Sequence, residues 1–167
     1  MLKSASPSRR RDEARTVVRL LTKRNMTLAT AESCTGGLIA NKLTNVSGAS
    51  KIFPGGIVAY SNDVKEKILG VRSDTLKIFG AVSETVAREM AEGSRKKFGA
   101  DYAIATTGIA GPTGGTKLKP VGTVFIAVAG KGKTLVVRKL NPFNRKKFKE
   151  ITARQALQLL LSQLAKT

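Results

Sequence analysis

The sequence has no histidine, no tryptophan and a single cysteine, Cys34, in 167 residues. Without histidine, the serine–histidine and cysteine–histidine pairs that activate many nucleophiles are excluded. With no histidine, one cysteine and only 11 acidic residues, the sequence has no recognisable zinc-binding cluster. Aspartate and glutamate alone could still hold a magnesium ion, but we predict no metal. One cysteine excludes an internal disulfide and favours a reducing compartment. Any nucleophile in this chain therefore needs a base other than histidine.

Long hydrophobic runs are also missing. No apolar segment approaches the roughly 20 residues that a membrane span requires, and the first residues lack the apolar core of a signal peptide. We therefore expect a cytoplasmic protein with no membrane association.

Acidic residues are outnumbered by 30 lysines and arginines, which gives a formal charge of +19. This charge favours anionic partners, either nucleic acid or a phosphorylated small molecule. Aromatic residues that could stack on bases make up only 5%, and no nucleic-acid-binding signature accompanies the charge. The small molecule is the favoured interpretation, and nucleic acid is the alternative. The basic residues cluster at 9–11, 95–97 and 138–149.

The length fits one domain with a substantial core. Residues 1–11 are polar, basic and proline-bearing and predict a mobile tail, and residues 12–167 form the expected domain. Hydrophobic periodicity in the domain predicts alternating helices and strands, with a hairpin near the end. We expect an α/β fold of three α/β/α layers with a mixed sheet. The predicted helices are 13–23, 36–46, 61–69, 83–97 and 145–164, and the predicted strands are 27–30, 55–60, 101–107, 121–129 and 134–140.

Ser33 lies at the predicted turn from the first strand into the next helix. The free N–H groups of a helix N-terminus suit an oxyanion or a phosphate. Thr35 is a candidate N-cap, and Gly36 and Gly37 would let a ligand approach the backbone. The alternative is that Ser33 and Thr35 only cap the helix. We expect the neighbouring Cys34 to be a buried thiol.

Two further predicted strands end near polar residues, Tyr60 and Thr107. Ligands gather at the carboxyl ends of strands in open α/β sheets, so Ser33, Tyr60 and Thr107 could line one site. Lys65 is our candidate base for Ser33, because a serine–lysine pair can replace histidine. It would need a lowered pKa, and Tyr60 could relay the proton or orient it. The alternative is that Lys65 is a solvated helix lysine.

A glycine-rich segment, residues 108–116, follows Thr107 and contains Gly108 and Gly111. Such a loop can cradle a phosphate through its backbone N–H groups, or it can simply form an irregular turn. It has neither the Walker spacing nor the dinucleotide-binding glycine pattern. The sequence therefore supports neither an ATPase nor a dinucleotide fold, and we predict no cofactor.

Taken together, these segments resemble the CinA C-terminal domain family, whose enzymatic members are nicotinamide mononucleotide deamidases. The resemblance extends over about residues 14–164. It is carried by residues 31–37 (AESCTGG), 56–62 with Lys65 (GIVAYSN), 70–71, 80–84 (GAVSE), 107–112 (TGIAGP) and 119–124 (KPVGTV).

This resemblance implies an amidohydrolase that converts nicotinamide mononucleotide into nicotinate mononucleotide and ammonia, in pyridine-nucleotide salvage. Ser33 would be the nucleophile, Lys65 the base, Tyr60 a proton relay or orienting hydroxyl, and Thr107 a helper near the nucleophile or the oxyanion. The backbone N–H groups of the following helix would stabilise the oxyanion. The resemblance also implies a homo-oligomer, and we expect the form without the second domain to which some relatives are fused.

The heavy positive charge departs from the family pattern, as do the loops at residues 53–55 and 117–119. Two alternatives to the deamidase therefore stay open. One is a non-catalytic protein of the same fold that associates with DNA, and the other is a serine amidase for a different small amide.

Overall fold

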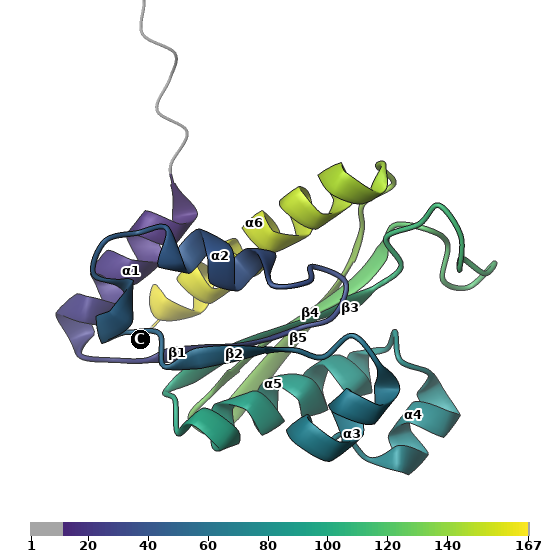
Figure 1. Ribbon diagram of the computed structural model, residues 1–167, viewed down its shortest axis with the longest axis horizontal. Helices are drawn as coiled ribbons and strands as arrows, with labels where there is room; N and C mark the ends of the chain where they lie inside the picture. The colour runs from purple at the N-terminus through teal and green to yellow at the C-terminus, as the bar shows by residue number, and fades with distance from the viewer. Residues whose placement is uncertain (1–11, 167) are drawn as a thin grey trace, which may run out of the picture.

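The structure is a computed structural model that describes residues 12–166, so the tail predicted for residues 1–11 lies outside the described residues. Helices cover both faces of a five-stranded sheet with the order β2-β1-β3-β4-β5 (Figure 1). The predicted three-layer α/β fold with a mixed sheet is confirmed.

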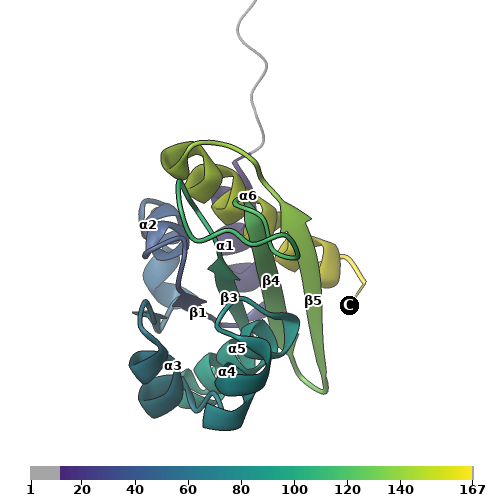
Figure 2. The ribbon, with the colours of Figure 1, turned by 90° about the vertical axis from the view of Figure 1, so that its right-hand side faces the viewer.

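The sheet is parallel in its first half and antiparallel in its second. Strands β2, β1 and β3 are parallel, whereas β4 and β5 form the predicted hairpin. Figure 2 shows β3, β4 and β5 side by side. The strands are β1 (Leu28–Glu32), β2 (Gly55–Val58), β3 (Tyr102–Gly108), β4 (Thr123–Gly130) and β5 (Lys133–Leu140).

Each face of the sheet has its own set of helices. One face carries α1 (Glu13–Arg24), α2 (Leu38–Thr44) and α6 (Arg145–Leu164), and the other carries α3 (Asn62–Leu69), α4 (Ser73–Phe79) and α5 (Glu84–Phe98) (Figure 1). A short 3-10 helix, η1 (Ala49–Lys51), precedes β2. Sequence periodicity did not predict α4, which is only seven residues long and has one buried residue, Thr75.

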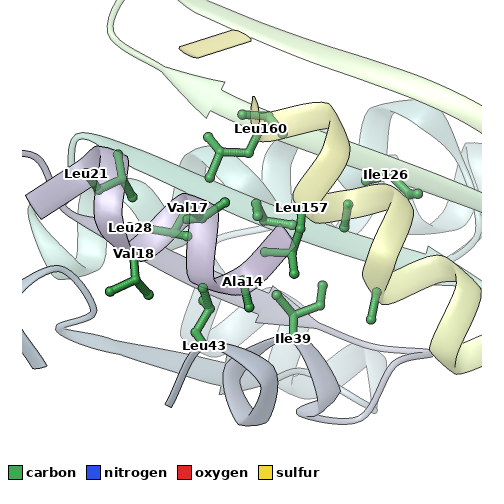
Figure 3. Close-up of a cluster of buried hydrophobic side chains, with 14 of the residues drawn as sticks. Ala14, Val17, Val18, Leu21, Leu28, Ile39, Leu43, Ile126, Leu157 and Leu160 are labelled. Atoms are coloured by element: carbon green, nitrogen blue, oxygen red, sulfur yellow. The ribbon is translucent and has the colours of Figure 1, made fainter. Parts of the chain in front are cut away.

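The two faces differ in side-chain size because successive strand residues point to opposite sides. Ile104, Ile126 and Val128 pack in the cluster formed with α1, α2 and α6. Figure 3 shows Ile126 with Leu157 of α6 and Val17 of α1 in this cluster. Ala105 and Ala127 belong to the opposite cluster, with α5. Small residues there let α5 approach the sheet closely.

Helix α3 begins and ends as predicted. The Ser61 side chain caps its first turn by accepting a hydrogen bond from the Val64 backbone N–H. Gly70 ends the helix in the left-handed region, with φ of 73°, a conformation that glycine adopts without steric cost. These caps fix the two ends of the helix that carries Lys65.

The apolar run at residues 55–60 predicts a buried strand, and this prediction is wrong. β2 is an edge strand that pairs only with β1, and alternate residues are exposed, including Val58 at 52%. An apolar run does not by itself distinguish a central strand from an edge strand.

Gly93 sets the distance between α5 and the end of α3. A Cβ at Gly93 would lie 1.8 Å from the Leu69 carbonyl oxygen. Gly93→Ala should therefore destabilise the protein by about 1–3 kcal/mol, although alanine normally favours a helix over glycine. Urea unfolding would measure the change, with the exposed Lys97→Ala on the same helix as the control. A more stable Gly93→Ala variant would contradict this close contact.

Candidate active site

The candidate site is a pocket of about 210 Å³ at the carboxyl ends of β1, β2 and β3. Four predicted residues line it together: Ser33, Tyr60, Lys65 and Thr107. They converge because the parallel strands end at the same edge of the sheet, and because α3 returns from the end of β2 against that edge. Sequence alone could not establish this convergence.

Ser33 and Lys65 are in direct contact. Lys65 Nζ donates a hydrogen bond to Ser33 Oγ at 3.1 Å, across 32 positions of sequence. Ser33 is held at the end of β1 because its backbone N–H bonds the Thr106 carbonyl at 3.0 Å. A nucleophile and a base within hydrogen-bond reach of each other are the basic unit of serine catalysis.

The Lys65 side chain is buried, with only 1% of its surface exposed. Its Nζ also donates to the Ala59 carbonyl at 2.8 Å and more weakly to the Tyr60 carbonyl at 3.4 Å. Burial lowers the pKa of the Lys65 ammonium below its ordinary value. The structure thus excludes the alternative of a solvated helix lysine.

Cys34 would counteract this lowering of the Lys65 pKa only as a charged thiolate. Burial raises the pKa of its thiol to about 12, so the sulfur is uncharged at neutral pH and provides no anion beside Lys65. Cys34 is 6% exposed, which confirms the predicted buried thiol. A protonated thiol is a poor nucleophile, and Ser33 is the better candidate.

Tyr60 and Thr107 differ in detail from the prediction. The Tyr60 hydroxyl accepts a hydrogen bond from Arg145 Nη2, so in this structure Tyr60 contacts Lys65 through its carbonyl and not its hydroxyl. The Thr107 hydroxyl donates to the Ala81 carbonyl at 2.7 Å. Both side chains line the pocket, but neither bonds Lys65 or Ser33 directly.

The residues proposed for substrate binding divide into two groups. Gly108 lines the pocket, and Gly111 is linked to it because its carbonyl accepts from Arg145 Nη1 at 3.0 Å. Thr35, Gly36 and Gly37 are not among the lining residues. The prediction of Thr35 as N-cap is wrong, since Gly37 occupies that position and the fully buried Thr35 hydroxyl pairs with that of Thr106.

Glu32 occupies the N-terminus of α2. Its carboxylate accepts hydrogen bonds from the backbone N–H groups of Gly37, Ile39 and Ala40 at 3.1, 3.0 and 2.8 Å. A buried carboxylate satisfies these free donors and the positive end of the helix dipole. The predicted oxyanion site at the start of the helix is therefore already filled by the protein's own anion.

One backbone donor next to Ser33 remains. Within residues 12–166, no other residue accepts a hydrogen bond from the Cys34 backbone N–H. This N–H directly follows the candidate nucleophile Ser33, and Cys34 lines the pocket, so it is the better candidate for an oxyanion donor.

Two residues in or next to the candidate site were given no site role in the sequence analysis. Arg145 begins α6, 80 positions after Lys65, yet its guanidinium lines the pocket. Glu32 belongs to the 31–37 motif but lies beyond the predicted strand 27–30, and its side chain was assigned no role from the sequence.

Across residues 12–166, the structure has no group of three or more cysteine, aspartate or glutamate side chains placed to hold a metal ion. Over the same range, no helix combines the length and the apolar character needed to cross a membrane.

The fold and the site define a three-layer α/β domain with a buried serine–lysine pair at the carboxyl edge of its sheet. The chain belongs to the CinA family, since the model of the CinA C-terminal domain matches residues 10–164. This confirms the resemblance inferred from the motifs.

Two solved structures are similar over nearly their whole length. The competence/damage inducible protein CihA from Agrobacterium tumefaciens is 40% identical, with a TM-score of 0.89 and coverage of 96% of this chain and 98% of that one. The competence damage-inducible protein A (ComA) from Klebsiella pneumoniae is 37% identical, with a TM-score of 0.89 and coverage of 92% and 96%.

Curated relatives include longer proteins. The CinA-like protein of Thermotoga maritima is 62% identical over 112 residues, which are 67% of this chain and 28% of that protein. The CinA-like protein of Kosmotoga olearia is 52% identical over 141 residues, which are 84% of this chain and 34% of that protein. The chain thus spans about a third of the length of these relatives.

Replacing Glu32 tests its role as the cap of α2. Glu32→Gln keeps one acceptor oxygen but removes the charge and the second oxygen, so we expect a loss of about 1–3 kcal/mol in unfolding free energy. Thermal and urea unfolding would measure it. The exposed Glu66→Gln on α3 is the matched control and should stay within about 0.5 kcal/mol of the unmodified protein. Equal stability of the two variants would rule out the capping role.

Proposed function

We propose that this domain is an amidohydrolase that releases ammonia from nicotinamide mononucleotide and leaves nicotinate mononucleotide. The observation that carries the proposal is the buried contact between Lys65 Nζ and Ser33 Oγ in a pocket. Membership of the CinA C-terminal domain family supports the choice of substrate.

The contacts of Lys65 suit a general base. When the amine is neutral it has two N–H groups and one lone pair. The N–H groups can point to the carbonyls of Ala59 and Tyr60, which leaves the lone pair directed at the Ser33 hydroxyl. The lowered pKa of Lys65 increases the fraction in this neutral form.

The reaction would proceed through an acyl-enzyme. Ser33 Oγ attacks the carboxamide carbon while its proton moves to Lys65 Nζ, and the Cys34 N–H donates to the oxyanion. The C–N bond then breaks, and the Lys65 ammonium returns the proton so that ammonia leaves. Water, deprotonated by Lys65, hydrolyses the nicotinoyl ester, restores the Ser33 hydroxyl and releases the carboxylate product.

The pocket suits one end of a nucleotide. Its volume of about 210 Å³ lies below the range of about 300–1,000 Å³ that is typical of sites enclosing a whole ligand. The carboxamide ring would enter, and the ribose phosphate would stay near the mouth, where Tyr60 is 61% exposed and Arg145 provides a cation. Arginine matches phosphate oxygens in a fork geometry.

Activity is tested by measuring ammonia release from nicotinamide mononucleotide in a metal-chelated buffer. We expect turnover by the unmodified protein and a loss of at least about 10³-fold in both Ser33→Ala and Lys65→Met, because each removes half of the nucleophile–base pair. Circular dichroism would verify that the variants are folded. Ser47→Ala, at an exposed position away from the pocket, is the control.

The outcomes separate the candidate functions. Ammonia from nicotinamide riboside as readily as from the mononucleotide would favour a different small-amide substrate, since only the mononucleotide carries the phosphate. Undiminished activity in Ser33→Ala would overturn the mechanism. No ammonia from any of the folded proteins would contradict the enzyme and favour a non-catalytic member of the family.

The pH dependence follows from the neutral form of Lys65. Because the base must be unprotonated, kcat/KM should rise with pH through the pKa of Lys65 and level off below about pH 10.4, the ordinary lysine value. The same lowered pKa makes the unfolded chain bind more protons in this range, so unfolding free energy should also rise with pH. Lys65→Met should remove this increment of stability. A rate that falls between pH 6 and 9 would contradict the role of Lys65.

A further inference from the structure

The excess positive charge is unevenly distributed between the two helical layers. The charge of the layer of α3, α4 and α5 is nearly balanced, because eight basic residues accompany six acidic ones. Its basic residues are Lys65, Lys67, Arg72, Lys77, Arg88, Arg95, Lys96 and Lys97. Its acidic residues are Asp63, Glu66, Asp74, Glu84, Glu89 and Glu92. Most of the charge must therefore lie elsewhere.

The layer of α1, α2 and α6 is strongly basic. Its acidic residues within residues 12–166 are Asp12, Glu13 and Glu150, and Glu13 is paired with Arg154 at 2.9 Å. Its basic residues are Arg15, Arg19, Lys23, Arg24, Lys42, Lys51, Arg145, Lys146, Lys147, Lys149, Arg154 and Lys166. One face of the domain thus has a large excess of cations.

This face contains a groove of about 420 Å³ between α1 and the segment around η1, which we call the α1 groove. Its lining includes Arg15, Arg19, Lys23 and Lys51 and no acidic side chain. All four cations are exposed, and within residues 12–166 Arg19, Lys23 and Lys51 have no carboxylate partner.

The spacing of these cations suits a phosphate backbone. Arg15, Arg19 and Lys23 repeat every four residues along α1, so they rise about 6 Å at each step along one side of the helix. The row is about 12 Å long, which is comparable to three or four nucleotides of a duplex strand at about 3.4 Å each. Lys51 adds a cation from the opposite wall of the groove.

We infer that the α1 groove binds the phosphate backbone of duplex nucleic acid without reading its sequence. The groove has no aromatic side chain on which a base could stack, which disfavours single-stranded recognition. The exposed large hydrophobic side chains, such as Val58, Ile78 and Leu118, lie outside the groove. An anionic membrane surface fits less well, because the apolar side chains that line the groove, Val18 and Val46, are buried and cannot insert.

The groove lies away from the candidate active site. Lys23 and Lys51 precede the starts of β1 and β2, at the amino ends of the parallel strands, whereas Ser33 and Lys65 lie at the carboxyl ends. Nucleic acid could therefore be bound while the pocket stays open. This inference does not depend on the proposed deamidase activity.

The test is fluorescence anisotropy with a DNA duplex of about 20 base pairs, titrated with the full chain between about 50 and 200 mM salt. The groove variant combines Arg19→Gln, Lys23→Gln and Lys51→Gln. The control combines Lys77→Gln, Lys96→Gln and Lys97→Gln on the other layer, so both lose the same net charge. We expect the groove variant to bind at least about tenfold more weakly and its salt slope to fall by about 2.7, with little change in the control.

Other outcomes would overturn the inference. Equal losses in the two variants would mean that only the net charge acts. Tighter binding of the single strand than of the duplex, or no binding at all, would exclude a duplex site. Capture by phosphatidylserine vesicles that the groove substitutions abolish, with duplex binding unchanged, would identify a membrane surface instead. Thermal unfolding of both variants would verify that each is folded.

Discussion

The burial of the Lys65 amine is the constraint on which the rest of the site depends. A buried ammonium without partners is costly, so it must be hydrogen-bonded or neutral. Here the amine reaches the Ala59 carbonyl and the Ser33 hydroxyl. Both partners lie just after parallel strands, so the site requires β1 and β2 in register and α3 packed against the sheet. Stability and reactivity are linked because the same burial that costs stability lowers the pKa of Lys65.

The acidic groups that flank Ser33 in the sequence do not offset the lowering of the Lys65 pKa by burial. Glu32 is the nearest carboxylate along the chain to Ser33, but its oxygens are engaged by three backbone N–H groups of α2. Its negative charge is therefore balanced by the helix dipole. The Cys34 thiol is kept neutral by burial. Neither the Glu32 carboxylate nor the Cys34 sulfur therefore acts as a free negative charge that would favour the protonated form of Lys65.

The fold was predictable where a single helix or hairpin has its own start, stop or turn signals in the sequence. Helix α3 could be placed because Ser61 and Gly70 are strong start and stop signals, and the hairpin because glycine separates two β-branched runs. Helix α4 was not predictable because it is too short to show a clear hydrophobic period. The edge position of β2 was not predictable because it depends on which strands pair in the sheet. The local hydrophobic periodicity of the sequence indicates neither the presence of α4 nor the edge position of β2.

The site was predictable only in part, for a related reason. Four of the residues lie in motifs near the ends of strands: Ser33, Tyr60, Lys65 and Thr107. Because ligands bind at the carboxyl ends of strands in open α/β sheets, these residues could be assigned to one site. Arg145 lies 34 residues after Gly111, and only the path of α6 across the sheet brings its guanidinium to the Tyr60 hydroxyl and the Gly111 carbonyl. The assignment of Thr35 failed because Glu32 is a stronger acceptor than a hydroxyl for the N–H groups of α2.

The layer of α1, α2 and α6 carries more positive charge than the opposite layer, and its cations lie at both ends of the parallel strands. On the α1, α2 and α6 side, Arg145 faces the pocket at the carboxyl end, while Lys23 and Lys51 face the groove at the amino end. A basic layer of this kind would raise the local concentration of any phosphorylated compound near both sites. The pocket can select among such compounds because its volume of about 210 Å³ limits the group that fits beside Lys65, whereas the groove of about 420 Å³ is open and larger. The excess positive charge can therefore attract phosphorylated ligands both to the selective pocket and to the non-specific α1 groove, and neither site requires the other.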